Sequence, residues 1–365
     1  MQNQQKIAWE LLDTLLETPS VSGCEEPNQR HAIRHGKTFA DKVTTDTMGN
    51  VISILQPEAP FRVLLCGHMD EIGFRVTHID DKGMIHVQRA GGVNPKLYVG
   101  APMQISHVTY EDGKARIQTV TAVGAVVSES LKKERMEDKD LILDIGADTK
   151  EEAQAVVSVG DPVCADTKVV SLLGDRISCR ALDDKSGAFT VMEAARLAGG
   201  MGLSDQVGVW CATTVGEETT GRGAYQAAAQ VKPDCAVIVD VTWASDCPGT
   251  DPAETGDIRV GGGPVLCMSG MVNKTLNRKM EEAARKSGIP LQYEVAGGRT
   301  HTDGDTVTSS GIGVPCVLVS IPLRYMHSSV EVASRRDIEQ CIRLIAAFLK
   351  ELSGNETLSP LAEEI

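Results

Sequence analysis

Residues 211–224 read CATTVGEETTGRGA, and this stretch joins a predicted strand to a predicted helix. The apolar run 207–212 is typical of a buried strand, and it stops at Gly216. Two neighbouring acids follow, Glu217 and Glu218, before a turn rich in glycine and threonine leads into an alanine-rich helix. Burying an unpaired carboxylate costs several kcal/mol. The pair therefore requires either contact with water or cations that the rest of the chain gathers nearby.

Strands and helices alternate along both ends of the chain, which favours an α/β fold. Alternation of this kind predicts a mostly parallel, mixed sheet that is flanked by helices on both faces. The expected strands lie at 43–55 (a hairpin), 61–66, 206–213, 235–241, 291–295 and 316–321. The expected helices lie at 4–16, 26–35, 185–197, 274–286 and 335–352, with a polar, glycine-rich loop at 245–263.

Between these two ends, residues 74–174 have a different sequence pattern. Short segments that alternate apolar and polar residues are separated by turns such as Asp-Lys-Gly, Gly-Gly and Gly-Asp-Pro. This pattern indicates a small all-β domain. We therefore expect an α/β domain made of residues 1–73 and 175–365, interrupted by a β-barrel-like insert at 74–174.

Composition excludes several classes of partner. The formal net charge is −14, and an acidic excess of this size argues against binding to nucleic acid or to an anionic membrane. We find neither an apolar run of membrane-spanning length nor the pattern of a signal peptide at the N-terminus. The ten cysteines include no C-x-x-C pair, and several lie in apolar strands. Buried free thiols favour a reducing compartment, so we expect a cytoplasmic protein.

The predicted strand ends repeatedly carry residue types that bind metals. In open α/β sheets, ligands bind beyond the carboxyl ends of the strands. One histidine there is more often a surface residue, and one aspartate at a helix start is more often an N-cap. Five such places, at 68–70, 183–184, 217–218, 240 and 327, are much harder to dismiss. The residues are His68, Asp70, Asp183, Asp184, Glu217, Glu218, Asp240 and His327.

Two histidines with three or four carboxylates suit a pair of divalent first-row ions, Zn²⁺ or Co²⁺. Ligands that were all oxygen would instead have indicated Mg²⁺ or Ca²⁺. In two-metal hydrolases the ions lie roughly 3.5–4 Å apart and usually share a carboxylate and a water. That water becomes a hydroxide near neutral pH and attacks a carbonyl, so the sequence predicts a hydrolase.

The motifs together resemble the M42 family of dinuclear metallo-aminopeptidases, the tetrahedral or TET-type enzymes that include glutamyl and leucyl aminopeptidases. The resemblance covers nearly the whole chain in the right order. Its motifs are His68-Met69-Asp70, Ala181-Leu182-Asp183-Asp184-Lys185-Ser186-Gly187, Glu217-Glu218, Asp240 and Tyr325-Met326-His327-Ser328. It implies a fold of the phosphorylase/hydrolase-like metallopeptidase type, hydrolysis of N-terminal residues from peptides, and two divalent ions per subunit.

The resemblance also implies a role for each residue. His68 and Asp240 would bind one ion, Glu218 and His327 the other, and Asp183 would bridge both. Glu217 would be the general base that takes a proton from the bridging water and delivers it to the leaving amine. Asp70 would orient His68. The family further implies a homo-oligomer built from dimers, possibly a tetrahedral dodecamer, with the insert serving dimerisation and substrate access.

Some positions depart from the family pattern. The usual Gln-Glu-Glu-Val-Gly reads Gly216-Glu217-Glu218-Thr219-Thr220 here, and Lys185 stands where arginine is frequent. No expected ligand is lost, but the substrate preference is open. His301 is either a substrate contact or a solvent-exposed loop residue. Arg324 either pairs with a ligand carboxylate or a substrate carbonyl, or forms a structural ion pair.

Three other functions are compatible with parts of this pattern. A metallo-deacylase or carboxypeptidase of the same clan would usually carry its extra domain after the acid pair rather than directly after residues 68–70. A glycosidase needs two carboxyls flanking its bond at roughly 5–9.5 Å, which adjacent acids hardly provide. A scaffold with a vestigial site would not need the intact ligand set or Glu217.

Overall fold

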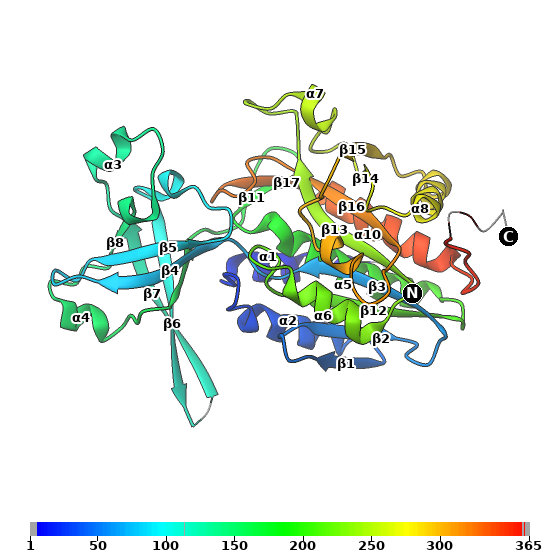
Figure 1. Ribbon diagram of the computed structural model, residues 1–365, viewed down its shortest axis with the longest axis horizontal. Helices are drawn as coiled ribbons and strands as arrows, with labels where there is room; N and C mark the ends of the chain where they lie inside the picture. Colours follow the sequence, from blue (N-terminus) through cyan, green and yellow to red (C-terminus); the bar gives the residue numbers. More distant parts are fainter. Residues whose placement is uncertain (1–5, 113, 360, 362–365) are drawn as a thin grey trace.

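A mixed sheet of eight strands forms the larger part of the molecule, and a closed β-barrel lies at one end of it (Figure 1). The computed structural model describes residues 6–112, 114–359 and 361. In spatial order the strands of the sheet are β1 (Lys42–Thr45), β2 (Val51–Leu55), β12 (Val207–Thr214), β3 (Phe61–His68), β13 (Cys235–Trp243), β16 (Cys316–Leu323), β14 (Val265–Ser269) and β15 (Gln292–Ala296).

The centre of this sheet is parallel and its margins are not. Strands β12, β3, β13 and β16 run parallel to one another. The β1–β2 hairpin joins antiparallel to β12, and β14 runs antiparallel to β16. The predicted α/β class with a mostly parallel, mixed sheet is confirmed. The sequence analysis left residues 265–269 unassigned, and they form strand β14.

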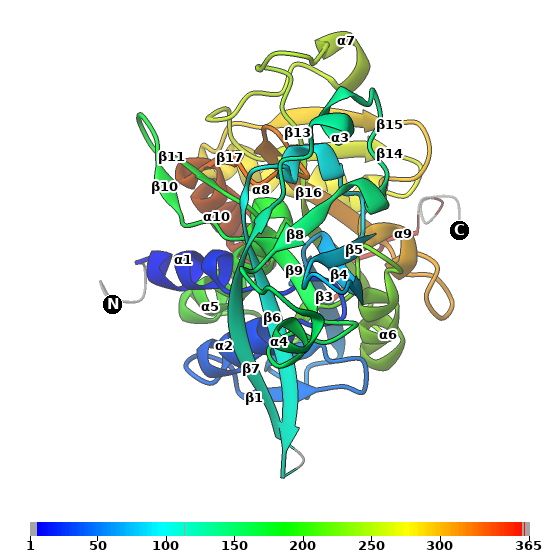
Figure 2. The same ribbon diagram turned by 90° about the vertical axis from the view of Figure 1, so that its left-hand side faces the viewer.

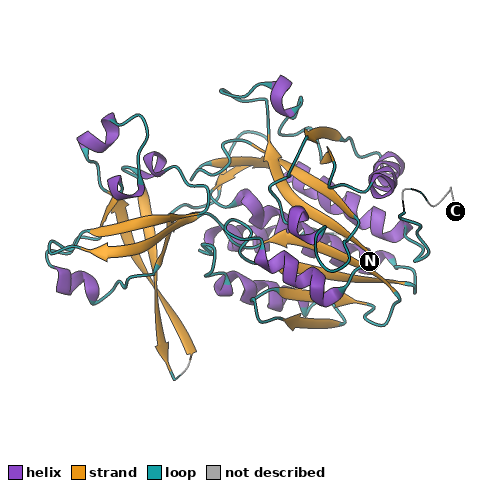
Figure 3. Cartoon of the chain, viewed as in Figure 1, coloured by secondary structure: helices purple, strands orange, loops and turns teal. Residues whose placement is uncertain are grey.

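Helices cover both faces of the sheet (Figure 3). The larger hydrophobic core lies under α1, α5, α8 and α10, and a second core lies under α6 and α9. No helix in the described part of the chain is long and apolar enough to cross a membrane. The helices are α1 (Trp9–Glu17), α2 (Glu26–Gly36), α5 (Leu182–Met201), α6 (Arg222–Val231), α7 (Pro252–Thr255), α8 (Lys274–Ser287), α9 (Gly304–Val307) and α10 (Arg335–Glu351).

The barrel is closed in the order β4-β5-β8-β7-β6-β9 and encloses an apolar core of its own. Its β6–β7 hairpin extends away from it (Figures 1 and 2). The elements are β4 (Gly73–Ile79), β5 (Ile85–Ala90), η2 (Pro95–Tyr98), β6 (Pro102–Glu111), β7 (Lys114–Gly124), α3 (Ser128–Lys132), η3 (Asp138–Asp140), β8 (Ile142–Asp144), α4 (Lys150–Gln154) and β9 (Pro162–Ala165).

A small three-stranded sheet connects the barrel to the rest of the chain. It contains β10 (Val170–Ser171), β11 (Arg176–Cys179) and β17 (Glu331–Ser334), all antiparallel. Strand β11 precedes α5, and β17 precedes α10. The small sheet therefore brings the segments 180–184 and 324–331 together beside the carboxyl ends of β3 and β12.

Candidate metal centre

Parallel pairing in the centre of the sheet brings the strand-end residues to one edge. His68 is the last residue of β3 and lies opposite Thr214, the last residue of β12. The Gly216–Glu218 turn follows β12 directly, and Asp240 lies near the end of β13 on the other side of β3. The strands thus place one histidine between two sources of carboxylates, as parallel strands with a common end require.

The expected ligands form two groups that share one residue. His68, Asp183 and Asp240 can offer ligand atoms within 4.8 Å of one another, and so can Asp183, Glu218 and His327. The two carboxylate oxygens of Asp183 divide between the histidines. Oδ1 lies 3.4 Å from His68 Nε2, and Oδ2 lies 3.2 Å from His327 Nε2. Asp183 is therefore placed to bridge two ions.

The spacing within each group fits divalent ions. Two ligand atoms that each lie about 2.1 Å from a tetrahedral ion are roughly 3.4 Å apart. The Asp183 contacts have this spacing, and Glu218 Oε2 lies 3.6 Å from His327 Nε2. Glu218 Oε1 is buried and has no hydrogen-bond partner among the described residues. A buried carboxylate oxygen without a partner is costly, so the donor set fits a metal pair.

The charges of the centre also fit a pair of bound metal ions. Burial, with the charges of nearby acids, raises the pKa values of Glu218 and Asp240 well above their usual range. For Glu217, burial and neighbouring Asp303 and Asp183 outweigh His68 and raise the pKa to about 8. Burial also raises the pKa of Asp183, but hydrogen bonds from His327 and His68 outweigh burial and lower it. The centre is rich in negative charge, which bound cations would compensate.

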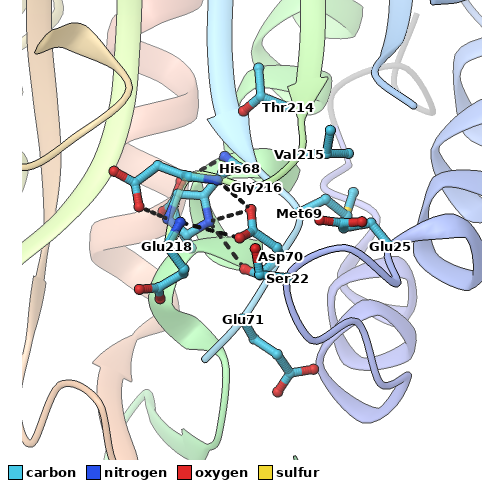
Figure 4. Close-up of polar contacts among 12 residues, drawn as sticks. Ser22, Glu25, His68, Met69, Asp70, Glu71, Thr214, Val215, Gly216 and Glu218 are labelled. Carbon is cyan, nitrogen blue, oxygen red and sulfur yellow. Dashed lines mark hydrogen bonds and ion pairs between the residues drawn. The ribbon is translucent and has the colours of Figure 1, made fainter. Parts of the chain in front are cut away.

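Asp70 holds the turn that carries the two adjacent acids. Its Oδ1 accepts a hydrogen bond from the backbone N–H of Glu217 at 3.0 Å, and its Oδ2 accepts one from Glu218 at 3.2 Å. The Nδ1 atom of His68 lies 3.1 Å from the Asp70 carbonyl oxygen and 3.5 Å from Oδ1 (Figure 4). One buried residue thus fixes His68 and both glutamates.

The start of α5 agrees with the helix predicted at 185–197. Asp183 and Asp184 have non-helical backbone angles, and helical geometry starts after them. Asp184 is fully buried. Its Oδ2 accepts the backbone N–H of His68 at 3.2 Å, and its Oδ1 accepts that of Gly187 at 3.0 Å. Asp184 therefore connects the α5 segment to the end of β3.

The sequence analysis missed two buried acids near the centre. Glu331, the first residue of β17, accepts backbone hydrogen bonds from Asp183 at 3.1 Å and from His327 at 2.8 Å. Asp303 accepts a hydrogen bond from the hydroxyl of Thr214, and its Oδ1 has no partner among the described residues. A sequence signal for Asp303 was its place two residues after His301, in a loop that the sequence analysis considered only for that histidine. Glu331 had none, because it acts on backbone groups that no motif reveals.

The three basic residues that the sequence left open have distinct surroundings. Lys185 is fully buried, and its Nζ donates to Glu71 Oε1 at 2.8 Å and to the Thr18 carbonyl at 2.7 Å. Arg324 forms a structural ion pair with Asp246, in which its Nε and Nη2 lie 2.7 and 2.6 Å from the carboxylate oxygens. His301 is exposed and lines the cleft that opens over the centre.

This cleft has a volume of about 760 Å³. It extends from the expected ligands, including Asp240 and His327, across the ends of β13, β16, β14 and β15. Gly92, from the loop after β5 of the barrel, also lines it. The cleft is large enough for the end of a peptide, and Glu217 faces into it.

Comparisons with known proteins identify the architecture. The model of the M42 glutamyl aminopeptidase family matches residues 49–344. A lysyl aminopeptidase of Pyrococcus furiosus is 32% identical, over 95% of this chain and 98% of its own. A TET aminopeptidase of a marine-sediment Thaumarchaeota archaeon superposes with a TM-score of 0.85 at 31% identity, covering 96% of this chain and 97% of its own. The TET1 peptidase of Pyrococcus horikoshii, described as assembling into a tetrahedron or a large octahedral shell, has a TM-score of 0.80 at 32% identity, covering 94% and 99%.

Proposed function

The chain belongs to the M42 glutamyl aminopeptidase family and is a peptide hydrolase, and from this premise we propose how its site works. His68 and Asp240 would hold one divalent ion, Glu218 and His327 would hold a second, and Asp183 would contribute to both. The observation that carries this assignment is the division of the Asp183 oxygens between the two histidines. Histidine nitrogen mixed with carboxylate oxygen suits Zn²⁺ or Co²⁺.

When bound, such ions act as Lewis acids toward a peptide carbonyl and make a water nucleophilic near neutral pH. Glu217 supplies the proton transfer. It lies in the cleft 3.8 Å from His68 Nε2, outside both ligand groups. Its carboxylate takes a proton from the attacking water as the carbon–oxygen bond forms. It then gives that proton to the nitrogen of the leaving peptide as the carbon–nitrogen bond breaks.

Asp70 supports this chemistry by keeping Glu217 and Glu218 in different roles. Because both backbone N–H groups donate to the one Asp70 carboxylate, the turn is fixed while the two side chains are free to separate. Glu218 approaches His327 and Glu217 approaches His68. One acid then serves as a ligand and its neighbour as the base.

A panel of aminoacyl-p-nitroanilides tests the function, with Zn²⁺, Co²⁺ or Mn²⁺ added to the metal-depleted protein. We expect release of p-nitroaniline that depends on metal. Substituting Glu217→Gln should lower kcat by 10²-fold or more, the usual contribution of a general base, while two ions per chain remain bound. Turnover of the variant at the wild-type rate would overturn the assignment of the base.

The same panel separates the alternatives. N-acetylated substrates or C-terminal residues would be hydrolysed instead if the protein were a deacylase or carboxypeptidase. Cellodextrins would be cleaved by a glycosidase, a mechanism that leaves His68 and His327 without a role.

We also propose the domain division and assembly expected from the family. Residues 1–73 and 175–365 form the catalytic part, and residues 74–174 form an insert that serves dimerisation and substrate access. The P. horikoshii relative is described as forming closed shells, which supports a homo-oligomer, possibly a tetrahedral dodecamer, for this chain. Light scattering distinguishes a monomer, a dimer and a dodecamer. The ten free cysteines support a reducing, cytoplasmic location.

A further inference from the structure

The cleft contains a half-buried carboxylate that the hydrolytic chemistry does not use. Glu294 on β15 lines the cleft, and its Oε1 accepts a hydrogen bond from Ser320 Oγ at 2.8 Å. Its Oε2 accepts one from the hydroxyl of Thr242. No cation lies within ion-pair distance of this carboxylate in the part of the chain that the structure describes. Since a carboxylate has about four acceptor positions, the hydroxyls leave room for further donors.

The sheet register places this carboxylate at a short distance from the metal centre. Ser320 on β16 lies opposite Asp240 on β13, one strand spacing away, or about 4.8 Å. Thr242 lies two residues beyond Asp240, or roughly 6.8 Å along the same strand. Glu294 bonds to both hydroxyls, so its carboxylate lies on the Asp240 side of β16. This separation suits an extended lysine or arginine side chain on a residue held at the centre.

The surface around Glu294 suits such a side chain in composition too. Cys267 and Leu318 line the cleft beside it, and in the register of the sheet these two residues and Glu294 lie on adjacent strands. A basic side chain has an apolar stem and a charged tip. The stem would contact Leu318 and Cys267, and the tip would reach the carboxylate.

The cleft offers less to an acidic side chain. Arg299 lines it, but this guanidinium is 75% exposed and lies 3.4 Å from Asp305. Glu254 also lines the cleft and adds negative charge. Outside the expected metal ligands and the base, the less exposed acids of the cleft are Glu294 and Asp305, while Arg299 and Glu254 are exposed.

We propose that Glu294 determines specificity and that the cleft selects peptides with an N-terminal lysine or arginine. The proposal rests on the aminopeptidase function given above and names its substrate class. Glu294 binds the side chain of the substrate, while the reacting carbonyl lies at the metal centre.

The experiment compares p-nitroanilides of lysine, arginine, norleucine, leucine and glutamate on the metal-loaded, full-length enzyme. Norleucine matches the stem of lysine without its charge. We expect kcat/KM for lysine to exceed that for norleucine at least tenfold. Glu294→Gln should remove most of this lysine-to-norleucine preference, chiefly by raising KM for the lysine substrate. It should leave turnover of the norleucine substrate within about threefold of the wild-type value. Glu281→Gln is the matched control, because it removes an acid from nearby α8 outside the cleft and should leave the ratio unchanged.

Glu294→Asp is a second variant that keeps the charge but shortens the side chain, and it should shift preference from lysine toward the longer arginine. Binding of L-lysinamide and L-norleucinamide to the inactive Glu217→Gln protein, measured by calorimetry, provides a readout without turnover. Wild-type preference for leucine or glutamate, or a lysine-to-norleucine ratio that survives Glu294→Gln, would overturn the proposal. If the enzyme cleaved none of the aminoacyl substrates, the result would instead contradict the proposed aminopeptidase function itself.

Discussion

Glu331 Oε1 accepts a hydrogen bond from the backbone N–H of His327 at 2.8 Å, and its Oε2 accepts one from Asp183 at 3.1 Å. His327 has a left-handed backbone, with φ of 64°, which non-glycine residues rarely adopt. The hydrogen bond to Glu331 helps to hold it there. One buried carboxylate thus connects the proposed terminal ligand to the proposed bridging ligand through their main chains.

Replacing Glu331 should weaken metal binding without removing a ligand. We expect Glu331→Ala to lower the affinity for Zn²⁺ by about 10–100-fold, as is usual when a group that supports a ligand is lost. Glu331→Gln keeps one acceptor oxygen and should have a smaller effect. Competition with a chromophoric chelator measures the affinity. Glu339→Ala on the exposed side of α10 is the control, and equal affinities in all four proteins would contradict the supporting role.

Replacing either ligand histidine should reduce the number of bound ions. We expect His68→Ala and His327→Ala each to retain about one ion or fewer per chain after dialysis, because each removes the only imidazole of its group. Elemental analysis gives the stoichiometry. His78→Ala in β4 of the barrel should retain two. Two tightly held ions in both ligand variants would refute the ligand set.

Asp70→Asn should reduce turnover more than substrate binding. The amide can accept only one of the two backbone hydrogen bonds from Glu217 and Glu218, and its NH₂ group would face the other donor. We expect kcat to fall by about 10–100-fold with a smaller change in KM. Steady-state kinetics on one aminoacyl-p-nitroanilide checks this, with the exposed Asp81→Asn as control. A change confined to KM would argue that Asp70 acts on substrate binding instead.

Glu193 should make the protein sensitive to acid at a place far from the metal ligands. Burial raises its pKa, but hydrogen bonds from Arg196, His35 and the Ala8 N–H outweigh burial and lower the pKa to about 2. The unfolded chain binds the proton more readily than the folded chain. The contribution of the ionised Glu193 carboxylate to folding stability is therefore complete above pH 4.5, and it is lost as the pH falls from about 4.5 to about 2. That fall in pKa corresponds to at most about 3 kcal/mol.

The measurement compares the Tm of wild type and Glu193→Gln in the metal-free protein across this range of pH. We expect the variant to have a lower Tm than wild type at pH 6, and the difference in Tm to become smaller toward pH 3. A difference in Tm that stays constant with pH would show that the ionised carboxylate does not contribute to stability through its charge.

The sequence analysis predicted the parts of the molecule that depend on strong local patterns. Long apolar strands predicted the centre of the sheet, and the residues at the strand ends supplied the candidates. The family resemblance selected from these candidates the five expected ligands, which the structure brings together around Asp183. The roles of these residues stay predictions until metal binding and activity are measured. Strand β14 was missed because its five residues follow a glycine-rich loop and carry no clear alternation.

Other features lay beyond any sequence pattern. Glu331 accepts main-chain hydrogen bonds from His327, which is four residues away, and from Asp183, which is 148 residues away, and no motif reveals either contact. The contact of Asp184 with the backbone N–H of His68 was also hidden, because Asp183 and Asp184 resemble ordinary N-cap residues. In both cases the decisive partners come from distant parts of the chain.

The contact between the barrel and His327 limits how freely the two parts of this protein can be recombined. Gly92, in the loop after β5, accepts a hydrogen bond at its carbonyl oxygen from His327 Nδ1 at 3.2 Å, and a Cβ at this glycine would lie 2.8 Å from the same nitrogen. An insert exchanged with that of a relative, or trimmed to alter assembly, would therefore also change the orientation of the proposed metal ligand His327. Chimeras that keep residues 91–93 should retain their metal centre where others lose it.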